Sequence, residues 1–275
     1  MSTASSLSCV WDCHTHIYGP WARFPLPADA AYQPAPAPFP ELLSMHRRLG
    51  ISNGVLVQAA PYGTNHSAIL EAIASSEGRY RGVGIIDEST SDYDLQALHE
   101  GGLRGIRFNL MGHLPGGRDP HKLRRLAERV APLGWHVLLH GELPILLPFL
   151  QNWRGLSTPI VIDHMARPDL TAPVDPALMR DFCTELGHAN RWIKLSGIDR
   201  AMSGQSGSWQ QGLDHARKLL EPAAERAIWG SDWPHPNIKG DVPDDAQLLD
   251  FIRQACDSTA LQQAVLTDNP ARLYG

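Results

Sequence analysis

Short apolar runs alternate with helix-length segments along the whole chain. The apolar runs occupy residues 8–16, 54–59, 80–86, 103–110, 135–140, 159–163, 192–196 and 226–232. Between and after them we expect helices over residues 39–49, 65–76, 94–100, 122–131, 144–153, 176–187, 208–220, 244–256 and 261–268. Near-continuous apolar strands that alternate with helices indicate a parallel sheet with both faces covered.

Eight such units within 275 residues have the size and count of a (β/α)8 barrel of the TIM type. A doubly wound open sheet is the alternative, but no Gly-x-Gly-x-x-Gly follows the first apolar run. We therefore expect one barrel domain over residues 1–275. Residues 17–40 carry seven prolines, and a loop of this length inside a compact domain usually covers an active site.

Composition narrows the class of protein. The apolar fraction of 43% and the charged fraction of 19% are ordinary for a globular chain. A net charge of −5 without a basic cluster argues against nucleic acid and membranes as partners. The chain starts without a signal-peptide pattern, and its four cysteines have no disulfide spacing. We expect a cytoplasmic protein, either a monomer or a homo-oligomer.

Histidines and one aspartate stand where the predicted strands end. His14 and His16 are two residues apart, so an extended strand points both to one side. His140, His164 and Asp232 end three later strands. Any one of these residues alone would be explained by a capping or hydrogen-bonding role. The C-terminal ends of barrel strands meet at one mouth, however, so the five residues together indicate a functional site.

These groups suit a metal ion. Imidazole nitrogen and carboxylate oxygen are the ligands of a divalent ion such as Zn²⁺. We predict one such ion, bound by His14, His16, His140 and Asp232, with a water in the open position. The ion would lower the pKa of that water to about 7 and so supply hydroxide at neutral pH.

Arg107, Arg167 and Arg200 stand at the same strand ends. Each guanidinium matches a carboxylate with two hydrogen bonds, so the three predict a site for a substrate that carries a carboxylate or sulfonate. The alternative is that they form surface ion pairs.

The motifs around these residues resemble the amidohydrolase superfamily, and more narrowly the branch of the 2-pyrone-4,6-dicarboxylate lactonases. The similarity runs from Asp12 to Tyr274. The segments that carry it are residues 12–20, 55–59, 63–64, 104–109, 161–169, 228–237 and 269–274.

The resemblance implies a barrel that hydrolyses a small acidic lactone, as in the catabolism of aromatic compounds. It implies that Asp232 activates water while His14, His16 and His164 polarise the ester carbonyl. The substrate-binding positions that it implies are Arg107, Arg167, Arg200, Tyr32, His113 and Asn237.

Three positions depart from the pyrone lactonases, which work without metal. The chain has His140 where they have Tyr, His113 where they have Arg, and Ala60 where they have Ser. Metal-dependent members of the superfamily use a histidine at the position of His140, which favours a metal here. The other two changes imply that the far end of the substrate is held differently, so lactones of sulfonated muconate or of sugar acids also fit.

Two other functions remain open at this point. One is a zinc-dependent decarboxylase of a small unsaturated or aromatic acid, which would release CO2 instead of opening a ring. The other is an anion-binding barrel without catalysis, which has no need of Asp232 as a base.

Overall fold

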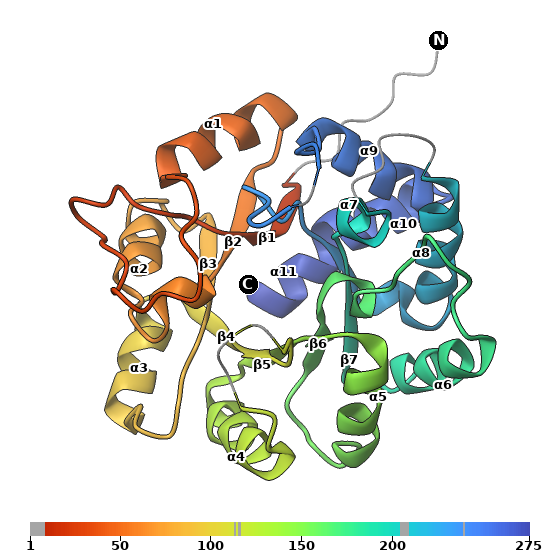
Figure 1. Cartoon of the computed structure of the whole chain (residues 1–275), viewed down its shortest axis with the longest axis horizontal. Helices are drawn as coiled ribbons and strands as arrows, with labels where there is room; N and C mark the ends of the chain where they lie inside the picture. The colour runs from red at the N-terminus through yellow and green to blue at the C-terminus, as the bar shows by residue number, and fades with distance from the viewer. Residues whose placement is uncertain (1–8, 113, 115–116, 204–208, 239) are drawn as a thin grey trace.

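The computed structural model describes residues 9–112, 114, 117–203, 209–238 and 240–275. Its strands form one parallel sheet in the order β1 to β8, in which each strand pairs with the next (Figure 1). The strands are β1 (Trp11–Thr15), β2 (Asn53–Val57), β3 (Tyr80–Gly84), β4 (Leu103–Asn109), β5 (His136–His140), β6 (Ile160–Ile162), β7 (Arg191–Leu195) and β8 (Ala227–Trp229).

Helices surround the sheet. They are α1 (Phe39–Leu49), α2 (Ser67–Ala74), α3 (Asp92–Glu100), α4 (Pro120–Val130), α5 (Leu143–Asn152), α6 (Pro176–Leu186), α7 (Ile198–Ala201), α8 (Gln210–Ala223), α9 (Asp245–Ala255), α10 (Thr259–Gln263) and α11 (Asn269–Tyr274). Short turns of other helix types are η1 (Ala60–Tyr62), η2 (Ala131–Leu133), η3 (Asp163–Ala166), η4 (Ala224–Arg226) and η5 (Ala264–Asp268). Local signals delimit some of the helices: Ser91 caps α3 through a capping box, and Gly50 ends α1 with a φ of 70°.

The sheet closes between β8 and β1. The Asp232 amide donates to the His14 carbonyl at 2.9 Å, and the His16 amide donates to the Trp233 carbonyl at 2.8 Å. The predicted (β/α)8 barrel is therefore confirmed.

Several strands end earlier than the sequence predicts. The last predicted strand covers residues 226–232, but β8 ends at Trp229. The backbone of Asp232 has a φ of 67°, in the left-handed region, which a strand does not accommodate. β1 and β6 likewise end at Thr15 and Ile162. Several of the predicted strand-end side chains therefore lie on the first residues of the loops. The predicted helix over residues 261–268 is α10 followed by η5, and the sequence pattern does not predict α7.

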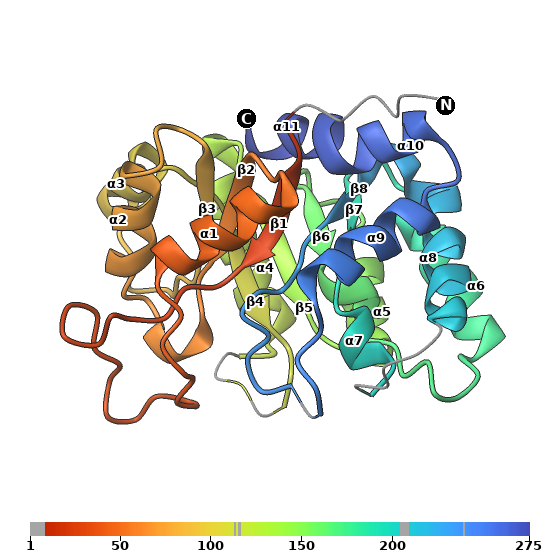
Figure 2. The ribbon, with the colours of Figure 1, turned by 90° about the horizontal axis from the view of Figure 1, so that it is seen from above.

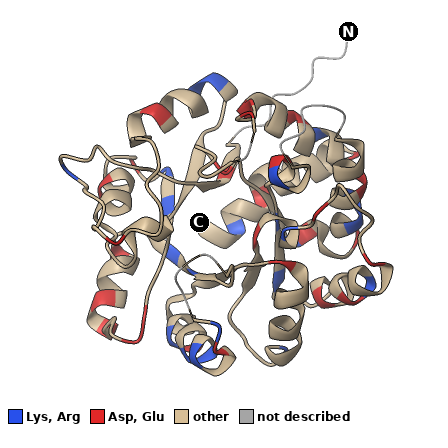
Figure 3. Ribbon diagram, viewed as in Figure 1, with Lys and Arg blue, Asp and Glu red and all other residues tan. Residues whose placement is uncertain are grey.

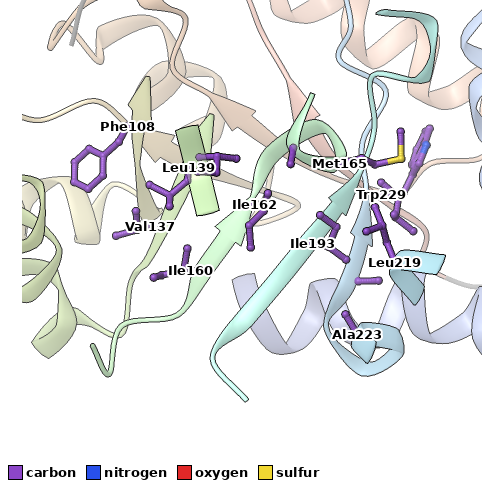
Figure 4. Close-up of a cluster of buried hydrophobic side chains, with 14 of the residues drawn as sticks. Phe108, Val137, Leu139, Ile160, Ile162, Met165, Ile193, Leu219, Ala223 and Trp229 are labelled. Atoms are coloured by element: carbon purple, nitrogen blue, oxygen red, sulfur yellow. The ribbon is translucent and has the colours of Figure 1, made fainter. Parts of the chain in front are cut away.

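Apolar side chains fill two layers. Residues that point away from the barrel axis, such as Ile160, Ile162 and Ile193, pack against the helices (Figure 4). Their neighbours along the strands, such as Val161, form a separate cluster inside the barrel. The interior layer also holds the charged residue Lys194, whose side chain is fully buried.

The two ends of the barrel differ. Figure 2 shows α10 and α11 at one end, and the connections that follow the strands at the other, including the long loop between β1 and α1. Basic and acidic residues are interspersed over the outer helices (Figure 3). Among the helices within the described residues, none is long and apolar enough to cross a membrane.

Candidate active site

A cavity of about 650 Å³ opens at the C-terminal ends of the strands. It brings together most of the residues that the sequence predicts for the site. Those that line it are His16, Tyr32, Arg107, His140, His164, Arg167, Arg200, Asp232 and Asn237. His14 is fully buried, and His113 lies outside the described residues. Another cavity, of about 780 Å³, lies between α6 and α8 on the outside of the barrel and contains none of the predicted site residues.

Three of the predicted metal ligands converge. The Nε2 atoms of His14 and His16 are 3.2 Å apart, and each is 3.5 Å from Oδ1 of Asp232. Nδ1 of His16 donates to the Val57 carbonyl at 2.8 Å, so in a neutral imidazole its Nε2 carries the lone pair. Burial is the main cause that lowers the pKa of His14 to about 3, which leaves a neutral imidazole. The cluster has the donor set of a divalent ion.

His140 stands apart from this cluster. Its Nδ1 lies 3.1 Å from Oδ1 of Asn109, and its ring centroid lies 5.4 Å from that of His164. Its Nε2 is buried without a hydrogen-bond partner among the described residues. Burial, followed by the charge of Arg107, holds the pKa of His140 well below its usual range. His140 therefore lines the same cavity as a neutral imidazole.

Asp163 lies beneath the cavity, where it contacts His14, Arg107 and Lys194. Its Oδ1 lies 3.0 Å from Nδ1 of His14, and its Oδ2 accepts from Arg107 at 3.0 Å. Nζ of Lys194 lies 3.5 Å from the same Oδ1. Burial alone would raise the pKa of Asp163, but His14, His164 and Lys194 outweigh it and hold the pKa well below its usual range.

A second group of possible ligands consists of His14, Asp163 and His164. The carboxylate of Asp163 is already paired with two positively charged side chains, because Arg107 and Lys194 both contact it. A metal ion there would face their positive charges at close range. The fit to an ion is therefore better at the cluster of His14, His16 and Asp232.

The backbone adopts a strained conformation at several site residues, and this conformation sets the direction of their side chains. His164, Arg167, Asp232 and Asn237 all have φ between 47° and 67°. This left-handed region costs a non-glycine residue about 1 kcal/mol or more, so such residues concentrate where function requires a particular direction. Four of the predicted site residues share this feature.

The end of β8 lies against β1. A Cβ atom added to Gly230 would lie 2.5 Å from Cβ of His14 and 2.7 Å from its amide nitrogen. The buried carboxylate of Asp12 joins the two ends, because it accepts from the amides of His14 and Ser231 at 3.1 and 2.9 Å. Glycine and aspartate at these positions hold His14 beside Asp232.

The three predicted anion-binding arginines differ in their partners. Arg107 contacts Asp163, while Nε of Arg200 donates to Oδ2 of Asp232 at 2.8 Å. The guanidinium of Arg167 makes no hydrogen bond or ion pair within the part of the chain that the structure describes, although it lines the cavity. Burial, followed by the charge of Arg200, lowers the pKa of Arg167. Arg167 is thus the cation that is available to an incoming anion.

Asp232 is held as a carboxylate. Burial would raise its pKa, but Arg200 and His164 are the leading causes that hold the pKa well below its usual range. Tyr32 also lines the cavity, and its hydroxyl is 3.0 Å from that of the buried Tyr18, which fixes Tyr32 within the long loop between β1 and α1.

Three residues of the site are absent from the sequence prediction. Asp163 and Lys194 lie beneath the cavity, and Glu142, just before α5, lines its wall. One signal points to Asp163, since it directly precedes His164 at a strand end. A second points to Lys194, the one charged residue inside an apolar stretch that runs from Trp192 to Leu195.

Residues 11–275 match the family described as amidohydrolase. The chain is 38% identical over 273 residues to a 2-pyrone-4,6-dicarboxylate hydrolase of Comamonas testosteroni, covering 96% of this chain and 89% of that protein. It is 34% identical over 271 residues to a 4-sulfomuconolactone hydrolase of Rhizobium radiobacter, with the same coverage. A crystal structure of a probable 2-pyrone-4,6-dicarboxylic acid hydrolase from Acinetobacter baumannii, with citric acid bound, is similar at a TM-score of 0.84 and 26% identity, covering 98% of this chain and 100% of that chain.

Proposed function

The chain belongs to the amidohydrolase family, and from this membership we propose that it hydrolyses the ring ester of a small lactone that carries a carboxylate or sulfonate. The observation that supports this most directly is the cavity at the barrel mouth, which Asp232, His164 and Arg167 all line. A reactive carboxylate and an anion anchor in one cavity of about 650 Å³ suit a small anionic substrate. Two curated relatives are named as hydrolases of acidic lactones, and a related crystal structure contains citric acid, itself a small carboxylate.

In this proposal Asp232 accepts a proton from the attacking water. It is buried and ionised, and its Oδ1 lies beside the imidazoles of His14 and His16. His164 lines the same cavity, and Ser196 fixes it through a contact of 2.9 Å to Nδ1. Its other nitrogen, Nε2, lies 3.5 Å from Oδ2 of Asp163, longer than a good hydrogen bond, and in this proposal Nε2 is the atom that meets the ester carbonyl or the leaving oxygen.

We further propose that His14, His16 and Asp232 bind one divalent ion such as Zn²⁺, with His140 as a candidate fourth ligand. When bound, the ion would polarise the ester carbonyl and lower the pKa of water. The three convergent acceptor atoms support this proposal, because two imidazole lone pairs and a carboxylate oxygen repel one another unless a cation or proton lies among them.

The substrate anion is assigned to Arg167, with Tyr32 and Asn237 as neighbours in the cavity wall. Arg107 and Arg200 are already paired with Asp163 and Asp232, so they contribute positive charge and hold those carboxylates. His113, which the resemblance assigns to the substrate, remains a prediction.

A panel of lactones tests this function. Lactones of pyrone dicarboxylic acid, sulfonated muconate and sugar acids would be assayed as free acids, and the carboxylic acids also as methyl esters. We expect ring opening of an anionic member, seen as one proton released per turnover and an added mass of one water. Release of CO2 from an unsaturated or aromatic acid would favour the decarboxylase instead. Equal rates of hydrolysis for the neutral methyl esters and the free acids would show that the arginines do not bind the substrate.

A further inference from the structure

Lys194 and Asp163 approach the same atom of His14. Nζ of Lys194 lies 3.1 Å from Nδ1 of His14, and Oδ1 of Asp163 lies 3.0 Å from it. All three side chains are fully buried, so bulk solvent does not screen the contact. One ring nitrogen therefore has two candidate partners of opposite charge.

The two partners require opposite tautomers of His14. A carboxylate can only accept, so a bond to Asp163 needs a hydrogen on Nδ1. An ammonium can only donate, so a bond from Lys194 needs a lone pair on Nδ1. In a neutral imidazole the choice at Nδ1 also fixes Nε2, because one nitrogen carries the hydrogen and the other the lone pair.

The two tautomers have different consequences at the cavity. When Asp163 is the partner, Nε2 of His14 presents a lone pair to Nε2 of His16, 3.2 Å away, which in a neutral imidazole also carries a lone pair because Nδ1 of His16 donates to the Val57 carbonyl. That arrangement needs a cation. When Lys194 is the partner, Nε2 of His14 donates its hydrogen to Nε2 of His16, and the pair is satisfied without an ion.

We propose that Lys194 and Asp163 compete for Nδ1 of His14, and that this competition sets how tightly the centre binds a divalent ion. Asp163 stabilises the tautomer that binds an ion, and Lys194 stabilises the tautomer that does not. Lys194 is thus a positioning residue that opposes metal binding, in a cluster whose ligands otherwise fit an ion. This inference rests on the proposed ion site at His14, His16 and Asp232, but not on the identity of the lactone.

Two variants and a matched control test the competition by Zn²⁺ titration of metal-free protein against a chromophoric chelator. Lys194→Met should tighten Zn²⁺ binding about tenfold or more, because it removes the competing donor. Asp163→Asn should weaken binding by about ten- to a hundred-fold, the usual effect of removing the partner of a metal-binding histidine. Lys122→Met, on the surface, should change nothing. Effects of the same sign for the two buried variants, or no Zn²⁺ binding by Lys194→Met, would overturn the proposal.

A purely electrostatic effect of Lys194 would also change the affinity, so the tautomer itself must be observed. In ¹⁵N-histidine spectra of the wild-type protein, His14 should carry its hydrogen on Nε2 without metal and on Nδ1 with Zn²⁺. Metal-free Lys194→Met should already show the Nδ1–H form. This measurement needs no turnover, so failure of the lactone panel leaves it standing. An Nδ1–H form in metal-free wild-type protein would refute the competition even if no variant folds.

Discussion

Replacement of Arg167 by Met tests how the cavity binds an anion. The side chain lines the cavity and makes no ion pair with any residue that the structure describes. Its removal therefore leaves no carboxylate without a partner, and Met keeps most of the apolar volume of the stem. Arg107 and Arg200 are poorer probes, because each is paired with a buried aspartate. Loss of one member of such a pair costs about 3–5 kcal/mol in stability, which would confuse a kinetic result.

The expected magnitude follows from one charge-assisted contact. Such a hydrogen bond contributes about 1.5–3 kcal/mol. At about 1.4 kcal/mol for each factor of ten, kcat/KM on the true anionic lactone should fall by roughly ten- to a hundred-fold. Arg167→Lys should recover only part of this, because a point charge does not reproduce two parallel hydrogen bonds.

Steady-state kinetics on paired substrates would measure this effect. The anionic lactone and its neutral methyl ester are compared in the wild-type protein, Arg167→Met and the surface control Arg217→Met. The loss should be confined to the anionic substrate and to Arg167→Met. An equal loss on both substrates would show that Arg167 acts on the structure of the mouth, and no loss on either would refute its role as the anion anchor.

Four further predictions concern the base, the ion, the backbone and acid stability. Asp232→Asn should lower kcat more than tenfold, because the amide cannot accept the proton of water, and it should also lower the melting temperature, because Arg200 loses its carboxylate partner. Removal of metal with a strong chelator should lower kcat, and Zn²⁺ should restore it; full activity without metal in the protein would contradict the ion site. Gly230→Ala should destabilise the fold by about 1–3 kcal/mol and reduce activity, because its Cβ would lie 2.5 Å from that of His14, as a melting curve would show. Burial lowers the pKa of His66 to about 4. The unfolded chain therefore takes up this proton first, and His66 alone should lower stability by on the order of 3 kcal/mol between about pH 6.5 and 4, in addition to the effect of other buried histidines such as His136. His66→Gln should lessen that fall in urea unfolding at the two pH values.

The architecture could be predicted from the sequence because it depends on a repeated local pattern. Apolar runs separated by helices fix parallel strands, and the ends of such strands meet at one mouth. That argument alone places His16, His140, His164 and Asp232 around one cavity. It fails at the strand ends, since the left-handed backbone of residues such as Asp232 depends on contacts made after the strand has ended.

The partners of the site residues could not be predicted, because they depend on contacts across the barrel. Asp163 meets His14 from 149 positions away, and Lys194 from 180 positions away. The sequence identified Arg107 and Arg200 as anion-binding residues, and the structure shows that the anions they contact are aspartates of the chain itself. Spacing along a strand indicates which side chains face the mouth, but not which of them are already paired.

The balance of charges in the site affects how binding of the metal ion and binding of the substrate influence each other. Four cations, from Arg107, Arg167, Arg200 and Lys194, surround two buried carboxylates, those of Asp163 and Asp232. The site therefore carries excess positive charge within a chain whose net charge is −5. A divalent ion adds to this excess, and an anionic lactone reduces it. Because charges interact strongly at low dielectric, each should bind more tightly in the presence of the other. Zn²⁺ affinity measured with and without a non-hydrolysable carboxylate ligand should rise with the ligand in the wild-type protein, and the rise should shrink in Arg167→Met. A ligand that leaves Zn²⁺ affinity unchanged would mean that Glu142, on the cavity wall, already offsets the excess charge.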